Sequence, residues 1–239
     1  MEASWIILII GLVLVLVSVG AYYAYLREKK RRLALQALAY ELGWTFDPFK
    51  DRTHDVFYAH FEIFRRGHSR AAFNTLTGSV EINGRWYDAK MGDFSYKITT
   101  SNGKTTSTHT YHFSYLIVHL PFVGVPDLLI RREHLLDKFA GFVGFSDLNF
   151  ESAQFSKRFH VQCADRKFAY DLIDPRMMEF FLESDPSTID IEHGRMCLSN
   201  GRTRWDVEHF KTQLEWMQQF FQRWPRHVKV DLDARLSPF

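Results

Sequence analysis

Residues 94–118 read FSYKITTSNGKTTSTHTYHFSYLIV and predict two antiparallel strands joined by a turn. Apolar and polar residues alternate on both sides of Asn102-Gly103, and a period of two is typical of strands with one buried face. Asn-Gly supplies the positive φ angles that a two-residue hairpin turn needs. Such a turn sets Phe94 opposite Tyr111 and leaves a Thr-rich tip, residues 99–110, in solvent. The stretch therefore predicts a long antiparallel hairpin at the centre of the fold.

The same period of two extends toward the amino terminus. Phe57, Ala59, Phe61 and Ile63 alternate with polar or half-polar residues, which predicts a strand over 57–63. A second Asn-Gly pair at 83–84 lies between strand-like runs and predicts another tight hairpin turn.

Toward the carboxyl terminus the pattern becomes mixed. Helix-capping residues stand before apolar runs of helical period, and short strands lie between them. We expect strands at 128–132, at 155–163 and on both sides of His193-Gly194, and helices that begin after Asp165, Asp174 and Asp206. Strands first and helices later define an α+β domain: one amino-terminal transmembrane helix, then an antiparallel sheet, with helices mainly in the carboxyl-terminal half.

The transmembrane helix is predicted from residues 6–26, an uncharged apolar run. At about 1.5 Å per residue a helix of this length covers roughly 31 Å, close to the hydrocarbon thickness of a bilayer. Trp5 lies at one edge of the run and Tyr22, Tyr23 and Tyr25 at the other, where aromatic rings settle among headgroups. A cleaved signal peptide would instead need a basic segment before the run and a small-x-small site after it, and the sequence has neither.

A basic cluster follows the apolar run at once. It predicts an amino terminus outside and a domain in the cytoplasm, by the positive-inside rule. The cluster is either a topology determinant only or also a contact for anionic lipid headgroups. Its members are Arg27, Lys29, Lys30, Arg31 and Arg32.

The helix is expected to continue into the domain. Leu35, Leu38 and Leu42 recur at helical spacing, and Gly43 ends the pattern. We therefore predict five parts: an extracytoplasmic amino terminus (1–5), a transmembrane helix (6–26), a basic juxtamembrane and helical linker (27–43), an α+β cytoplasmic domain (44–228) and a tail (229–239).

Charge and cysteine usage narrow the function classes. Subtracting the five basic residues of the cluster and the acidic Glu2 and Glu28 from the totals of 30 and 28 leaves 25 basic and 26 acidic residues. A near-neutral domain lacks the basic face that nucleic-acid binding requires, so no nucleic-acid partner is expected. Cys163 and Cys197 lie in no zinc or redox spacing and are expected to be free thiols in a reducing cytoplasm.

No catalytic, cofactor or metal motif is present in the sequence. There is no nucleophile elbow, no phosphate loop and no metal-ligand pattern among the eleven histidines. His109 and His112 would point to opposite faces of one strand, so a metal site would have to join distant segments. The remaining basic pairs would bind anionic lipid if the fold gathered them on the membrane-facing side, and would otherwise be solvated charges: Arg65-Arg66, Arg131-Arg132 and Arg202 with Arg204.

One part of the chain resembles a known family. The resemblance covers roughly residues 33–228 and is most specific over 147–183. The residues that carry it are Phe150-Glu151-Ser152, Phe155, Phe159, Val161, Asp165, Ala169, Leu172 and Pro175-Arg176-Met177-Met178. The chain resembles a family of bacterial membrane-anchored proteins with a cytoplasmic domain of unknown function. The resemblance implies a bacterial inner-membrane location and carries over no catalytic or binding residue.

The sequence thus favours a single-pass protein whose domain binds a protein or lipid partner at the cytoplasmic face of the inner membrane. The alternative is an enzyme with a pocket between the sheet and the carboxyl-terminal helices. A third hypothesis places the domain outside the cytoplasm, with the first segment as a secretion anchor. The sequence predicts no cofactor and does not determine the oligomeric state.

Overall fold

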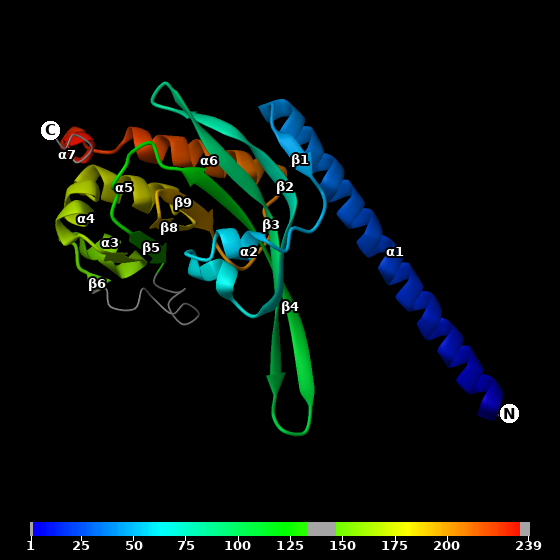
Figure 1. Cartoon of the computed structure of the whole chain (residues 1–239). Coiled ribbons are helices and arrows are strands. Elements are labelled where there is room, and N and C mark those ends of the chain that lie inside the picture. Colours follow the sequence, from blue (N-terminus) through cyan, green and yellow to red (C-terminus); the bar gives the residue numbers. More distant parts are fainter. Residues whose placement is uncertain (1, 133–146, 235–239) are drawn as a thin grey trace.

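The computed structural model describes residues 2–132 and 147–234, which form an α+β domain beside one long helix (Figure 1). A single antiparallel sheet runs through the domain in the order β1-β2-β3-β4-β9-β8-β5-β7-β6. Its strands are β1 (Thr45–Asp47), β2 (His68–Ile82), β3 (Arg85–Ser101), β4 (Thr106–His119), β5 (Leu128–Arg132), β6 (Asp147–Leu148), β7 (Phe159–Cys163), β8 (Thr188–Glu192) and β9 (Arg195–Ser199). The helices are α1 (Glu2–Leu42), α2 (His54–Phe57), the 3₁₀ turn η1 (Glu62–Arg65), α3 (Ala153–Arg158), α4 (Arg166–Leu172), α5 (Pro175–Ser184), α6 (Val207–Gln222) and α7 (Arg226–Ala234). The predicted fold class is confirmed.

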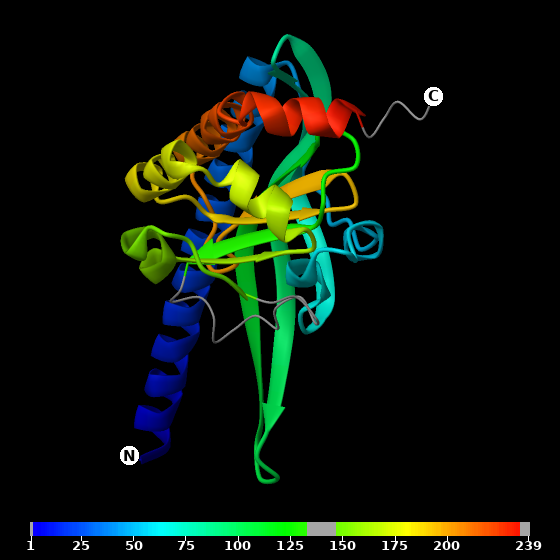
Figure 2. The same ribbon diagram turned by 90° about the vertical axis from the view of Figure 1, so that its left-hand side faces the viewer.

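The two faces of the sheet carry separate cores. On one face, apolar side chains of α3 to α7 and of the carboxyl-terminal part of α1 form the larger core (Figure 2). On the other face, Phe61 and Phe64 from the α2–η1 segment pack against Phe94, Phe113 and Tyr115 of the central hairpin. Alternation along β3 and β4 sends Phe94 and Phe113 to this smaller core, while Met91 and Leu116 point to the other face and join the larger core. Helix α1 docks on that other face, where Asp93 and Ser114 contact Arg31 beside the apolar residues.

The predicted strand over 57–63 is wrong. The segment forms α2, a turn and η1, and Phe57 at the end of α2 is exposed. Phe61 and Phe64 are both buried because a 3₁₀ turn has about three residues per turn and brings positions three apart to one side. Apolar and polar residues do alternate over 57–63, but this alternation does not indicate a strand here.

The central hairpin is confirmed, with a different register. Asn102 Oδ1 accepts hydrogen bonds from the N–H groups of Lys104 and Thr105, at 3.1 and 2.8 Å, which closes a loop longer than two residues. Ser101 therefore pairs with Thr106, and Phe94 pairs with Phe113 instead of Tyr111. The shift is two residues, so every side chain keeps its predicted face. The other turn is as predicted: Asn83 and Gly84 have φ of 52° and 78° between the paired residues Ile82 and Arg85.

The carboxyl-terminal elements follow their predicted caps. Asp165, Asp174 and Asp206 each accept a hydrogen bond from the N–H three residues on, and α4, α5 and α6 begin directly after them. The strands β8 and β9 flank His193-Gly194 as expected. Residues 155–163 divide into the end of α3 and β7, and α7 is an additional helix whose Val228 and Leu232 are buried.

Candidate membrane-proximal site

Helix α1 runs without a break from Glu2 to Leu42, yet it has two different surroundings. Every side chain from Ile9 to Arg27 is exposed, while Leu35, Leu38 and Ala39 are buried in the larger core. The exposed part is apolar and long enough to cross a membrane, a property that anchors share with signal sequences. The helix continues through the leucine-spaced segment to Leu42, and Gly43 follows it with a φ of 68°. The apolar part of α1 thus projects from the folded domain, and the basic cluster lies where it begins to project.

One member of the basic cluster, Arg31, points into the domain. Its guanidinium forms a two-armed ion pair with Asp93 on β3, at 2.6 and 2.8 Å, and its third nitrogen donates to the carbonyl of Trp205 at 2.8 Å. The Asp93 side chain is 0 % exposed and also accepts hydrogen bonds from Asn74 and Ser114. A buried charge is tolerated when it is paired and hydrogen-bonded in this way. The pair sets where α1 meets the sheet.

A second ion pair lies nearly one helical turn nearer the apolar run. Arg204, in the segment between β9 and α6, donates two hydrogen bonds to the Glu28 carboxylate, at 2.5 and 2.9 Å. These hydrogen bonds hold the pKa of Glu28 below its usual value, against a smaller opposing effect of burial. The sequence indicates Arg204 only as a lipid-binding or solvated charge, because nothing local in the chain links it to Glu28.

Around these two pairs lies a groove between α1 and the start of α6, with a volume of about 350 Å³. We call it the juxtamembrane groove; its lining residues are Arg27, Glu28, Lys30, Arg31, Ala34, Leu35, Arg204, Asp206 and Val207. Glu28 is neutralised by Arg204, Arg31 is neutralised by Asp93, and Asp206 caps α6. Among residues 2–132 and 147–234, Arg27 and Lys30 form no ion pair. The groove therefore presents two uncompensated cations.

The five predicted site residues consequently divide into three groups. Arg27 and Lys30 line the groove, Arg31 lies inward on Asp93, and Lys29 and Arg32 are exposed elsewhere on the helix surface. The lipid contact predicted for the cluster stays a prediction.

The other basic pairs do not gather there. Arg66 pairs with Glu62, and Arg132 pairs with Asp185. Of the residues in those pairs only Arg204 lines the juxtamembrane groove.

In the described parts of the chain no group of three potential metal ligands occurs, although the rings of His60 and His193 lie 4.9 Å apart. His54 is buried among the rings of Tyr58, Phe64 and Tyr115. Burial lowers its pKa to about 3, so it is a neutral part of the smaller core. Cys163 and Cys197 are free and buried, in agreement with the expected thiols.

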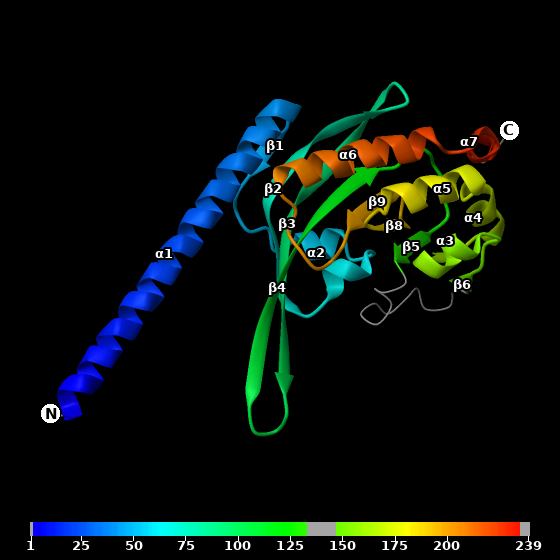
Figure 3. The ribbon, with the colours of Figure 1, turned by 180° about the vertical axis from the view of Figure 1, so that it is seen from behind.

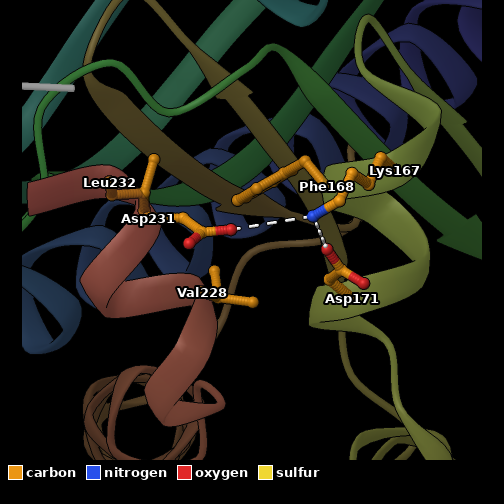
Figure 4. Close-up of a pocket in the computed structure, with 6 residues that line it drawn as sticks. All are labelled: Lys167, Phe168, Asp171, Val228, Asp231 and Leu232. Carbon is orange, nitrogen blue, oxygen red and sulfur yellow. Dashed lines mark hydrogen bonds and ion pairs between the residues drawn. The ribbon is translucent and has the colours of Figure 1, made fainter. Parts of the chain in front are cut away.

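The other hollows fit less well as sites. Aromatic side chains, including Phe181, Trp216 and Phe220, pack between α5 and α6. Beside them a hollow lined by Arg132, Thr188 and His209, among others, stays open between the sheet, α5 and α6, where the enzymatic alternative needs a pocket. Figure 4 shows a hollow between α4 and α7, where Lys167 joins Asp171 at 2.6 Å and Asp231 at 3.6 Å. Its volume of about 20 Å³ is close to that of one water. Two open surface hollows of about 400 and 460 Å³ flank α6, away from the apolar part of α1.

Comparison with known proteins supports the fold alone. No family model and no curated protein matches the chain. A solved structure that it resembles is the crystal structure of the mycobacterial trehalose monomycolate transport factor A, TtfA, with a TM-score of 0.55 and 10 % sequence identity. The match covers 81 % of this chain and 96 % of that one. At this identity the likeness establishes a shared architecture and no shared residue role.

Proposed function

We propose that this chain is a single-pass bacterial inner-membrane protein whose domain lies at the cytoplasmic face and whose juxtamembrane groove binds the phosphate of an anionic lipid. The observation that carries the proposal is the pair of uncompensated cations, Arg27 and Lys30, in a groove that begins where the apolar run ends. The cytoplasmic orientation is supported by the basic residues that follow the run.

The groove lies at the right depth for a headgroup. Arg27 follows Leu26 directly, and Lys30 lies about 6 Å beyond Leu26 along the helix at 1.5 Å per residue. The headgroup region adds roughly 5–8 Å on each side of the hydrocarbon layer. The two cations of the groove therefore fall within that region when residues 6–26 span the membrane. The structural neighbour, which its title names as a trehalose monomycolate transport factor, is compatible with a lipid-associated domain.

The pairing inside the groove leaves it able to attract an anion such as phosphate. Glu28 would repel an anion if it were free, but Arg204 holds its carboxylate in two hydrogen bonds. A second acid, Asp206, points its carboxylate at the N–H of His209. Arg27 and Lys30 remain to attract a phosphate, each contributing about 1 kcal/mol near an anionic surface.

The test compares two double variants of equal charge. The full chain is purified in detergent, and bound phosphatidylglycerol is titrated and counted by native mass spectrometry. Arg27→Gln/Lys30→Gln is expected to weaken the affinity for phosphatidylglycerol about thirtyfold, since about 2 kcal/mol of binding free energy is lost. Lys29→Gln/Arg32→Gln removes the same charge outside the groove and is the matched control. Equal losses in the two variants would show that the cluster attracts lipid by net charge alone and would refute the site.

Orientation is tested separately. A reporter that is active only in the periplasm, fused after Phe239, is expected to be silent, and a cytoplasmic reporter at the same place is expected to be active. Periplasmic activity would place the domain outside and overturn the topology.

A further inference from the structure

The central hairpin continues well past the point at which α1 meets the sheet. Arg31 and Asp93 join the two elements, and from this contact both run on toward the same side of the molecule. Figures 1 and 3 show the amino-terminal part of α1 and the tip of β3–β4 projecting together below the rest of the domain. The Arg31–Asp93 contact is therefore a common origin from which their reach can be compared.

Measured from this contact, the hairpin is longer than the stretch of α1 that leads to Leu26, the last residue of the apolar run. Five residues separate Arg31 from Leu26, about 7.5 Å of helix. Eight residues separate Asp93 from Ser101 at the end of β3, about 26 Å of strand. The two elements diverge, and transmembrane helices tilt by about 20°, with a range up to about 40°. A hairpin parallel to α1 would end about 19 Å beyond Leu26, and the divergence and tilt reduce this depth toward that of the headgroups.

The chemistry of the tip suits headgroups and not hydrocarbon. The sequence has no Asp or Glu between Asp93 and Asp127, while Lys97 and Lys104 lie on the hairpin. All side chains from Lys97 to His112 are exposed, and most of them carry hydroxyl groups. Cross-strand hydrogen bonds such as Thr99 Oγ1 to Thr108 Oγ1, at 2.8 Å, keep the paired strands together as they project. Hydroxyl and ammonium groups can donate to lipid phosphates, and no carboxylate opposes them.

We infer that the tip of the β3–β4 hairpin, residues 99–108, is a second membrane contact. It lies among the anionic headgroups of the leaflet on the same side of the bilayer as the domain. The inference rests on the proposed function, because it takes residues 6–26 as the membrane span. Together, α1 and the hairpin would hold the domain at two points and fix its tilt on the membrane. The partner is the lipid surface and not a soluble anion, because the position of the hairpin relative to α1 determines how close its tip comes to the membrane.

The experiment uses the two ends of β3 as a matched pair. Ser101→Cys places a label at the tip, and Arg85→Cys places one at the opposite end of the same strand, about 53 Å away for 16 residues of strand. Both positions are exposed. The native thiols Cys163 and Cys197 are buried, and burial raises the pKa of each, so they react slowly with the label. The full chain is placed in nanodiscs of phosphatidylcholine and phosphatidylglycerol that contain a lipid with a spin label on its headgroup.

We expect the fluorescence at Ser101→Cys to be quenched at least threefold more than that at Arg85→Cys. Equal quenching at the two ends would overturn the inference. Shielding of the tip from aqueous iodide without quenching by the lipid would indicate a protein contact and would also overturn it. A label at Ser18→Cys, read with an acyl-chain spin label, reports whether α1 is in the bilayer. If that label is not quenched, the membrane span itself fails, and the two failures are thereby distinguished.

Discussion

The two parts of α1 show how one continuous helix is adapted to two environments. From Ile9 to Arg27 nothing in the domain covers the side chains, and from Arg31 to Leu42 the helix is held by a buried ion pair and by leucines in the core. The first part is apolar and long enough to cross a membrane, and the second gains its stability from specific contacts. A substitution should therefore have very different consequences on the two sides of the basic cluster.

The largest effect is expected from Asp93→Ala. The change leaves Arg31 without its partner in a site where Asp93 is 0 % exposed, and removing one half of a buried pair costs about 3–5 kcal/mol. The free energy of unfolding of the full chain in detergent, followed by tryptophan fluorescence in urea, measures the loss. Asp88→Ala, an exposed position on the same strand, should cost less than about 0.5 kcal/mol. The combined Arg31→Met/Asp93→Leu variant should recover most of the loss, since neither charge remains; a cost of Asp93→Ala below about 1 kcal/mol would contradict the assignment.

The next largest effect is expected in the exposed part of α1. Leu16→Arg puts a charge near the middle of the apolar run, where it opposes insertion by about 2.5–3.5 kcal/mol. The fraction of the protein that resists alkaline extraction from membranes should fall, while the denaturation midpoint of the domain stays unchanged. Leu33→Arg is the control, because Leu33 is 58 % exposed and lies beyond the basic cluster. If both variants remain in the membrane fraction to the same extent, the apolar run does not act as the anchor.

The smallest effect is expected at the boundary between the two parts. Glu28→Gln weakens the pair with Arg204, which is partly exposed, and should cost about 0.5–1 kcal/mol at pH 7. The pKa of Glu28 is lowered in the folded state, so its stabilisation is present above pH 4.5 and is lost as the pH falls through the folded value. The difference between the wild type and the variant, measured by urea denaturation, should therefore vanish in acid. Glu41→Gln, which removes a more exposed pair on the same helix, should change less; an acid-independent difference would exclude the pair as its cause.

Much of the fold could be predicted because its signals are local. Asp165, Asp174 and Asp206 each satisfy an N–H three residues away, so short stretches of sequence define those helix starts. The hairpin register was less accessible. A shift of two residues keeps every side chain on its face, so the match of apolar with apolar residues could not distinguish Phe113 from Tyr111 as the partner of Phe94. The loop was decided by the hydrogen bonds of the Asn102 side chain.

The candidate site was predictable only in part. The basic cluster can be recognised in the sequence. The sequence does not indicate that Arg31 faces inward while Arg27 and Lys30 face a groove. That division depends on the direction of each residue around the helix relative to β3 and α6. The projection of the hairpin beside α1 has the same origin, because it follows from the contact between Arg31 and Asp93.

The sequence by itself determined the apolar run with its basic boundary, the α+β class and the capped helix starts, because each depends on patterns among residues that are near one another in the chain or on the order of those patterns. Only the tertiary structure decided which charges are neutralised. Arg31 and Asp93 are 62 residues apart, and Glu28 and Arg204 are 176 apart. Such pairs form when the sheet and its helices pack together, and no local pattern specifies them. The fold thereby leaves two cations of the basic cluster in a groove and projects one hairpin tip beside α1.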